Sequence, residues 1–130
     1  MNDMILLIED DRWLADSYRS VVSSKGYAVA VAASGTKAME LIDQKAPQLI
    51  IADVLLGDHT SLTLFHELQS YEDTAQIPVI LCTSIDTAQF ADVDLLGYGI
   101  VHVFDKATMT PDQLLMCIEE IMSNRVELVS

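Results

Sequence analysis

Basic residues are scarce in this sequence: seven Lys and Arg stand against twenty Asp and Glu in 130 residues, a formal charge of −13. Nucleic-acid backbones and anionic membranes repel such a chain, and a basic patch is the usual footprint of nucleic-acid binding. We therefore expect no direct contact with either. A DNA-directed role would need another domain or a partner protein.

Long apolar runs are also missing. No stretch of about 18 apolar residues occurs, so the sequence predicts no membrane-spanning helix. The N-terminus lacks a basic flank followed by an apolar segment and a cleavage site, which argues against a secretory signal. We predict a cytoplasmic protein.

Cysteine is limited to Cys82 and Cys117, both inside apolar patterns and without a Cys-x-x-Cys spacing. This favours reduced core residues over a metal or redox site. The histidines His59, His66 and His102 have no acidic or cysteine partner at a useful spacing, so we interpret them as surface or core residues.

Apolar material is plentiful, with 51% hydrophobic and 21% charged residues, which indicates a globular chain rather than a disordered one. The length fits a single domain. We predict one domain over residues 1–124 and a polar tail over residues 125–130, and leave open whether further sequence follows.

Short apolar runs alternate with helical patterns along the chain. The runs predict strands over residues 4–8, 28–32, 48–53, 79–82 and 100–104. Helices are predicted over residues 11–24, 35–46, 62–69, 86–96 and 111–122, and a polar loop over residues 54–61. The helix over 86–96 is the weakest of these, with Phe90 and Val93 on one side.

Helix starts carry recognisable signals. Asp11 and Ser34 are predicted N-caps of the first two helices. The last helix has the clearest start, in which Thr110 caps, Pro111 occupies the first turn and Gln113 reaches back to the cap.

Five strands that alternate with five helices predict a parallel sheet, since each strand must cross over through a helix to reach the next. Right-handed crossovers place helices on both faces. We predict a doubly wound sheet of strand order 2-1-3-4-5, in which ligands bind at the carboxyl ends of the first and third strands.

The run over residues 49–52 ends in a single carboxylate, Asp53. A charge at the end of a buried strand costs several kcal/mol unless it has a partner. Candidate partners follow three other predicted strands: Glu9, Asp10 and Asp11 after the first, Thr83 and Ser84 after the fourth, and Lys106 after the fifth.

Carboxylates that converge in one crevice repel each other unless a cation neutralises them. Mg²⁺ fits best, because it takes oxygen ligands and is commonly held by one or two carboxylates together with phosphate oxygens. We assign Asp10 and Asp53 as direct ligands, Glu9 as a ligand through water, and the Leu55 carbonyl as a further oxygen.

Beside a metal ion, an aspartate oxygen can attack a phosphoryl group and form an aspartyl phosphate. Lys106 supplies an amine and Thr83 a hydroxyl that could bind the transferred oxygens, so these two and Asp53 are the catalytic candidates. Before phosphorylation, Lys106 can pair with Asp53.

At these positions the chain resembles, over nearly its full length, the receiver domains of bacterial two-component response regulators, which have a flavodoxin-like fold. The matching residues are the acidic pair Glu9 and Asp10, the phosphoacceptor Asp53, the hydroxyl positions Thr83 and Ser84, and Lys106 after the fifth strand.

The resemblance implies phosphotransfer from a sensor histidine kinase or a histidine phosphotransferase, a requirement for Mg²⁺, and a downstream effector domain or protein. It implies a signalling domain rather than an enzyme that turns over substrate. The expected switch lies on the face of the fourth helix, fifth strand and fifth helix, with Thr83, Ser84 and Val103 at the switch positions. A homodimer is left open.

The sequence departs from the family pattern in three places. Ala107 follows Lys106 where proline is usual, so the loop lacks the residue that restricts its backbone in the family. Val103 replaces the switch aromatic, and strand alternation points its neighbour Phe104 to the other face. The loop after the acceptor has Gly57 and Ser61 where the family has Pro and Gly.

Other functions fit less well. A flavin carrier needs a phosphate-binding loop where Glu9, Asp10 and Asp11 would repel it, and a dehydrogenase needs G-x-G-x-x-G there. A phosphatase with an aspartyl intermediate would have a second acid where Leu55 stands. The serious alternative is a pseudo-receiver, a protein-binding module that keeps the fold without being phosphorylated.

Overall fold

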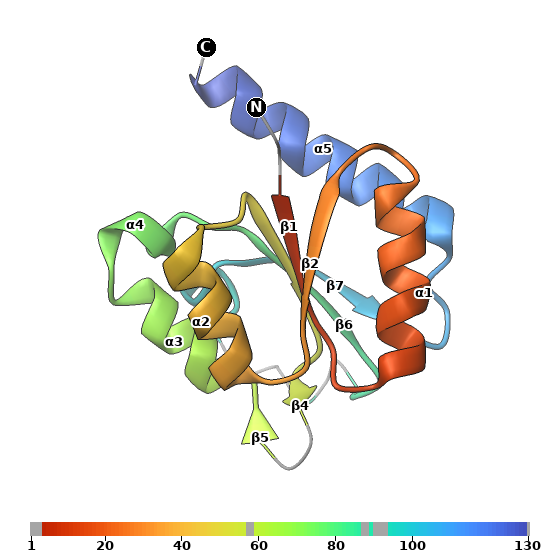
Figure 1. Cartoon of the computed structure of the whole chain (residues 1–130), viewed down its shortest axis with the longest axis horizontal. Coiled ribbons are helices and arrows are strands. Elements are labelled where there is room, and N and C mark those ends of the chain that lie inside the picture. Colours follow the sequence, from red (N-terminus) through yellow and green to blue (C-terminus); the bar gives the residue numbers. More distant parts are fainter. Residues whose placement is uncertain (1–3, 57–58, 87–88, 90–93, 130) are drawn as a thin grey trace.

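The computed structural model describes residues 4–56, 59–86, 89 and 94–129. Within them, five parallel strands form one sheet in the order β2-β1-β3-β6-β7 (Figure 1). These strands are β1 (Met4–Ile8), β2 (Ala28–Ala32), β3 (Leu49–Ala52), β6 (Val79–Thr83) and β7 (Ile100–Asp105). Counted along the chain, the order is 2-1-3-4-5, so the predicted topology is confirmed.

The central strand β3 is buried on both faces. Its residues alternate between two hydrophobic clusters, Leu49 and Ile51 on one face of the sheet, Ile50 and Ala52 on the other. Successive strand side chains point to opposite faces, so a strand covered on both sides needs an unbroken apolar run.

Helices cover both faces of this sheet (Figure 1). The described helices are α1 (Arg12–Ser23), α2 (Gly35–Gln44), α3 (Leu62–Gln69), α4 (Glu72–Ala75), α5 (Pro111–Val129) and the 3-10 helix η2 (Leu96–Tyr98). Val22 of α1 and Ile118 of α5 pack in the cluster on one face. Ala38 of α2 and Phe65 of α3 pack in the cluster on the other.

The predicted helix starts are confirmed. Asp11 and Ser34 each accept a first-turn backbone N–H, at 3.1 Å, and so cap α1 and α2. At α5, the Gln113 N–H donates to Thr110 Oγ1 at 3.2 Å and the Thr110 N–H donates to Gln113 Oε1 at 3.0 Å. This reciprocal pair is the predicted capping box.

The loop after Asp53 is more ordered than predicted. It contains a small antiparallel pair, β4 (Leu55–Leu56) and β5 (His59–Thr60). Ser61 closes its base, because the Ser61 hydroxyl donates to the Asp53 carbonyl at 2.6 Å and its N–H donates to the Val54 carbonyl at 2.7 Å. The sequence predicts only a polar loop over residues 54–61, and the two strands within it were missed because two-residue strands are too short to show a sequence period.

Much of the helix predicted over residues 86–96, including Phe90 and Val93, lies outside the described residues. The described chain resumes before η2, which ends at Gly99 with φ +80°. A Cβ at Gly99 would lie 3.3 Å from the Ile77 carbonyl and 2.8 Å from the Gln69 amide nitrogen. Glycine is therefore required for both conformation and space.

Two helical segments were not predicted. The short helix α4 is supported by the buried Thr74 hydroxyl, which donates to the Leu68 carbonyl at 2.6 Å. Helix α5 continues through residues 125–129, where the sequence predicts a tail. No helix in the described part of the chain is both long and apolar enough to cross a membrane.

Candidate functional site

Asp53 follows β3, the middle strand, at the carboxyl edge of the sheet. Its side chain is only 12% exposed, and its Oδ2 lies 2.7 Å from Lys106 Nζ. Its Oδ1 accepts the Leu55 backbone N–H at 3.2 Å, which is a turn contact within the same loop. The carboxylate therefore has the partners that a charge at a buried strand end requires.

Lys106 follows β7, the edge strand, and joins two acids. Its Nζ lies 2.6 Å from Glu9 Oε1 in addition to its contact with Asp53. Its backbone N–H donates to the Thr83 carbonyl at 3.0 Å, which ties the loop to β6. The predicted pairing of Lys106 with Asp53 is confirmed, and the pairing with Glu9 is an addition to it.

The electrostatics of this cluster follow from burial and pairing. Burial acts to lower the pKa of Lys106, but its hydrogen bonds to Asp53 and Glu9 outweigh burial and raise this pKa above its ordinary value of 10.5. Burial raises the pKa of Glu9 above 4.5, and the contact with Lys106 opposes that rise. Lys106 is thus a fixed positive charge between two carboxyl groups.

The acids after β1 differ in their surroundings. Glu9 is buried, 3% exposed, and its Oε2 accepts the Asp11 N–H at 3.2 Å. Asp10 is exposed, and its position beside Glu9 adds slightly to the rise in the pKa of Glu9 that burial causes. Asp11 caps α1, as predicted.

The donor set suits a hard divalent cation. With the three acids ionised, Glu9, Asp10 and Asp53 carry three negative charges and Lys106 one positive charge, which leaves two for a cation to balance. Among the described residues, no group of three or more acidic, His or Cys side chains is already gathered as a metal site. Mg²⁺ needs only one or two carboxylates beside water and phosphate oxygens, so the chemistry of the residues fits.

The hydroxyl and switch positions lie on the adjoining strands. Thr83, at the end of β6, is fully buried, and its Oγ1 accepts the Ile85 N–H at 3.2 Å. Ser84 is exposed. Val103 packs against the cluster on the α2 and α3 side, whereas Phe104 packs against the opposite cluster. The predicted alternation of these two β7 residues is confirmed.

Three residues near the site have roles that the sequence did not predict, although Ser61 was noted as a departure from the family pattern. Ser61 holds the Asp53 carbonyl, as described above. Asp105 accepts the Ala107 N–H at 2.8 Å in the loop that carries Lys106. An Asp followed two residues later by a loop N–H is a recognised turn signal, so Asp105 could have been found.

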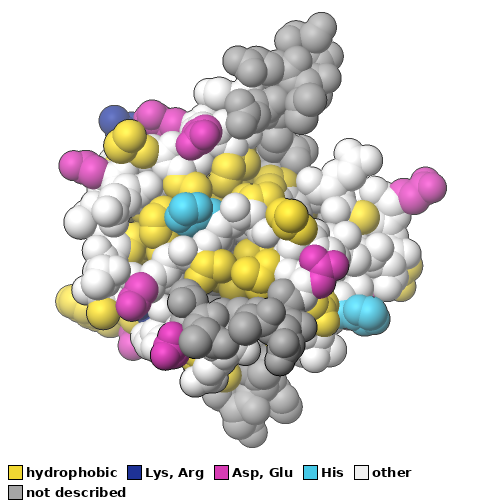
Figure 2. All heavy atoms as spheres, turned by 180° about the vertical axis from the view of Figure 1, so that it is seen from behind, with side chains coloured by type: hydrophobic (Ala, Val, Ile, Leu, Met, Phe, Trp, Pro, Cys, Tyr) yellow, Lys and Arg dark blue, Asp and Glu magenta, His cyan; other side chains and the backbone are white. Residues whose placement is uncertain are grey.

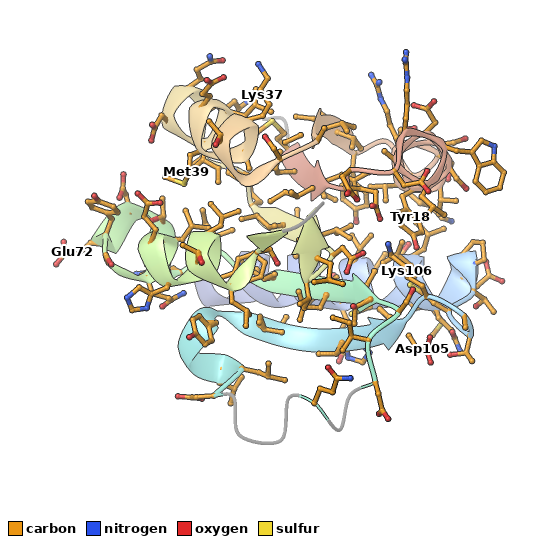
Figure 3. The ribbon with its side chains drawn as sticks, turned by 90° about the horizontal axis from the view of Figure 1, so that it is seen from below. Tyr18, Lys37, Met39, Glu72, Asp105 and Lys106 are labelled. Carbon is orange, nitrogen blue, oxygen red and sulfur yellow. The ribbon has the colours of Figure 1, made fainter. Side chains whose placement is uncertain are left out.

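The third is Tyr18 of α1, a half-buried residue on the same side of the molecule as Lys106 (Figure 3). Burial raises the pKa of Tyr18 to about 12, and interactions with Cys82, Glu9 and Asp53 add to the rise while Lys106 opposes it. The Tyr18 phenol is therefore coupled to the acid cluster. Its place in the regular helical pattern gave no signal for this.

Comparison with known proteins gives a consistent result. A family model described as the response regulator receiver domain matches residues 5–119. Response regulator MprA of Mycobacterium ulcerans (strain Agy99) is 31% identical over 87 residues, covering 67% of this chain and 37% of that protein. In MprA of Mycobacterium sp. (strain KMS) the matched region covers 35% of the protein's length. The chain therefore spans little more than a third of the length of these relatives.

Solved structures share the fold. The response regulator receiver domain protein (CheY-like) from Methanospirillum hungatei JF-1 gives a TM-score of 0.86 at 22% identity, covering 98% of each chain. The non-phosphorylated HemR receiver domain from Leptospira biflexa gives a TM-score of 0.81 at 23% identity, covering 94% of this chain and 95% of that chain.

The family match extends from β1 into α5 and so includes every strand of the sheet. It also contains the acids after β1, Asp53, Thr83 and Lys106, the residues that meet at one edge of that sheet. On this evidence, the chain belongs to the response regulator receiver domains of two-component signalling systems.

Proposed function

We propose that the chain receives a phosphoryl group on Asp53 from a phosphohistidine donor, with Mg²⁺, and transmits the change through protein contacts. The observation that carries the proposal is the contact of Lys106 with both Asp53 and Glu9 at the carboxyl ends of the strands. An ammonium held beside a strand-end carboxylate is placed to neutralise charge on a phosphoryl group transferred to it.

In the proposed step, an Asp53 carboxylate oxygen attacks the phosphorus of the phosphohistidine. The new P–O bond forms as the P–N bond breaks, and the imidazole leaves with the electron pair and takes up a proton. Lys106 then pairs with a phosphoryl oxygen in place of one of its carboxylate contacts. When bound, Mg²⁺ supplies positive charge to the transferred oxygens. Asp10 and Asp53 would hold it directly, with Glu9 through water and the Leu55 carbonyl as a further ligand.

The proposed switch starts at Thr83. The buried Thr83 hydroxyl accepts the Ile85 N–H. A phosphoryl oxygen on Asp53 would be an acceptor to which this hydroxyl could donate a hydrogen bond. Reorienting Thr83 would alter the packing between the ends of β6 and β7. Because Val103 has no ring to move, the change would pass through packing and loop position rather than through an aromatic rotamer.

The proposed upstream partner is a sensor histidine kinase or a histidine phosphotransferase, in the cytoplasm. The downstream partner is an effector domain or protein, since the relatives of this chain are response regulators that extend well beyond the matched region. The net charge of −13 makes direct binding of nucleic acid by this domain an unfavourable route to an output.

The test is phosphoryl uptake from acetyl phosphate with Mg²⁺, followed by intact mass spectrometry and peptide mapping. We expect one added phosphoryl group on wild type and none on Asp53→Asn, which keeps the shape of the side chain but lacks the nucleophilic oxygen. Asp43→Asn, at an exposed position on α2, is the matched control and should be labelled like wild type. Labelling of Asp53→Asn would move the acceptor elsewhere.

One observation favours the pseudo-receiver as a second candidate. Among the described residues, no group of three or more acidic, His or Cys side chains is gathered as a metal site. A wild-type chain that folds but takes up neither the phosphoryl group nor beryllofluoride with Mg²⁺ would support this alternative. Uptake on Asp53 alone would exclude it.

A further inference from the structure

The loop that carries Lys106 has no residue that restricts its backbone strongly. Ala107 and Thr108 follow the lysine, and neither fixes φ as proline does. All described peptide bonds are trans. Something else must hold this loop if the ammonium is to meet two acids at 2.6 and 2.7 Å.

Asp105 supplies that restraint. It is the last residue of β7, and its Oδ1 accepts the Ala107 N–H at 2.8 Å, which forms an Asx turn around the lysine. Its carbonyl also accepts the N–H groups of Thr108 and Met109, at 3.1 and 2.9 Å. The Asp105 side chain and backbone thus hold the three residues after Lys106.

The strand side of the lysine is fixed as well. The Lys106 N–H donates to the Thr83 carbonyl at 3.0 Å, and Asp105 is paired with Thr83 across β6 and β7. Figure 3 shows Asp105 and Lys106 together at this strand end. The backbone is therefore restrained on both sides of the residue whose side chain spans Glu9 and Asp53.

We propose that Asp105 is a positioning residue for Lys106: its carboxylate oxygen closes the turn that directs the ammonium onto Asp53 and Glu9. Asp105 is exposed, so water and salt screen its charge, and the lysine pairs with two other acids. The property of Asp105 that positions Lys106 is therefore an acceptor oxygen at the right distance from the backbone, and not its negative charge.

Two variants separate these properties. Asp105→Asn keeps an acceptor oxygen at the same place and removes the charge, whereas Asp105→Glu keeps the charge and moves it one methylene away from the Asx position. Asp105→Ala removes both. If Asp105→Ala fails to fold, the Asn and Glu variants still decide the question.

The first readout does not depend on phosphorylation. Folded protein is acylated with limiting acetic anhydride, and the modification of Lys106 relative to Lys37 is measured by mass spectrometry. Lys37 has a side chain that is 53% exposed and serves as the internal reference. We expect the ratio to rise about fivefold in Asp105→Glu and Asp105→Ala, the factor that corresponds to one lost hydrogen bond of about 1 kcal/mol, and to stay at the wild-type value in Asp105→Asn.

The second readout rests on the proposed function. With phosphoramidate and Mg²⁺, Asp105→Glu is expected to lower the maximal rate of phosphoryl uptake about fivefold without raising the half-saturating donor concentration, because Lys106 acts on charge that develops during transfer. Asp105→Asn should match wild type. A general loss of folding would change the melting temperature instead of separating these two parameters.

The outcomes are distinguishable. An unchanged acylation ratio in Asp105→Glu, or a raised ratio in Asp105→Asn, overturns the assignment of Asp105. Failure of the wild-type chain to accept a phosphoryl group overturns the proposed function but leaves the acylation result as a valid test of the turn.

Discussion

Lys106 and Asp53 are 53 residues apart in the chain and form a 2.7 Å ion pair between the ends of β7 and β3. The strand between them, β6, contributes the Thr83 carbonyl that anchors the lysine backbone. Both side chains are 12% exposed, so the pair is only weakly screened by solvent. Its properties can be tested without any phosphoryl donor.

Removal of the lysine is expected to destabilise the fold. Lys106→Met leaves the buried Glu9 and the nearby Asp53 without their cation, at a cost on the order of 3 kcal/mol in the free energy of unfolding. Urea denaturation at neutral pH measures this cost. Adding Glu9→Gln should recover part of it, and the double-mutant cycle gives the coupling.

The control for that experiment is Lys37→Met. Lys37 forms an exposed pair with Glu40 at 3.6 Å, and such surface pairs contribute about 0.5 kcal/mol or less. Equal destabilisation by Lys37→Met and Lys106→Met would contradict the central place given to Lys106.

Glu9 makes stability depend on pH. Its pKa in the folded protein is raised above 4.5 by burial, so its contribution to stability is fully present below that pH and is lost as the pH rises through the folded-state pKa. The Glu9→Gln variant has no carboxyl group to ionise, so it does not lose this stability as the pH rises. The melting temperature of the variant relative to wild type should therefore increase as the pH is raised from about 4.5 toward neutrality.

Glu40→Gln is a suitable reference for the Glu9 experiment, because Glu40 is an exposed helix residue. The pH dependence of Glu9→Gln is compared with that of Glu40→Gln. If Glu9→Gln behaved in the same way across the range, the burial of Glu9 would not govern its protonation.

Tyr18 is expected to ionise late. Its pKa is raised to about 12 from an ordinary 10.0, chiefly by burial. The neutral phenol is the form that the fold favours, so its contribution to stability is lost as the pH rises through about 12. Absorbance titration at alkaline pH should show a late phenol ionisation that is lost in Tyr18→Phe, and a titration curve whose late part is the same in Tyr18→Phe and wild type would contradict this.

The proposed binding of Mg²⁺ can be tested through Trp13, the single tryptophan, which is 78% exposed in the first turn of α1, two residues after the last of the acids that follow β1. We expect a saturable fluorescence change on titration with Mg²⁺ that is reversed by a chelator. Asp10→Asn should weaken binding at least about tenfold, because Mg²⁺ relies on only one or two carboxylates. Asp43→Asn should bind like wild type, and a titration unaffected by Asp10→Asn would contradict the ligand assignment.

Whether an apolar side chain near the edge strand β7 is buried or exposed could not be predicted from the sequence. Figure 2 shows hydrophobic side chains gathered around a histidine on one face of the molecule. Val101 is 46% exposed although it lies in the apolar run of β7, and Met116, which lies off the apolar face of α5, is 70% exposed. A period identifies which side chains share a face, but not whether another element covers that face.

The sequence by itself predicted the five strands of the parallel sheet, their order and the edge at which the functional residues meet. Unbroken apolar runs such as residues 49–52 require cover on both faces, and the parallel connection of strands brings their carboxyl ends together. The capping residues Asp11, Ser34 and Thr110 were also predicted from the sequence, because a cap depends only on neighbours within one turn.

Only the tertiary structure decided how the site is joined. The contact of Lys106 with Glu9 and the position of Tyr18 on the same side of the molecule as Lys106 depend on distances between elements far apart in the chain. The hydrogen bond from Ser61 to the Asp53 carbonyl depends on how the loop between these two residues folds. Periodicity fixes the direction of a side chain from its own backbone. The separation of two side chains depends on packing, twist and loop geometry, which no local pattern encodes.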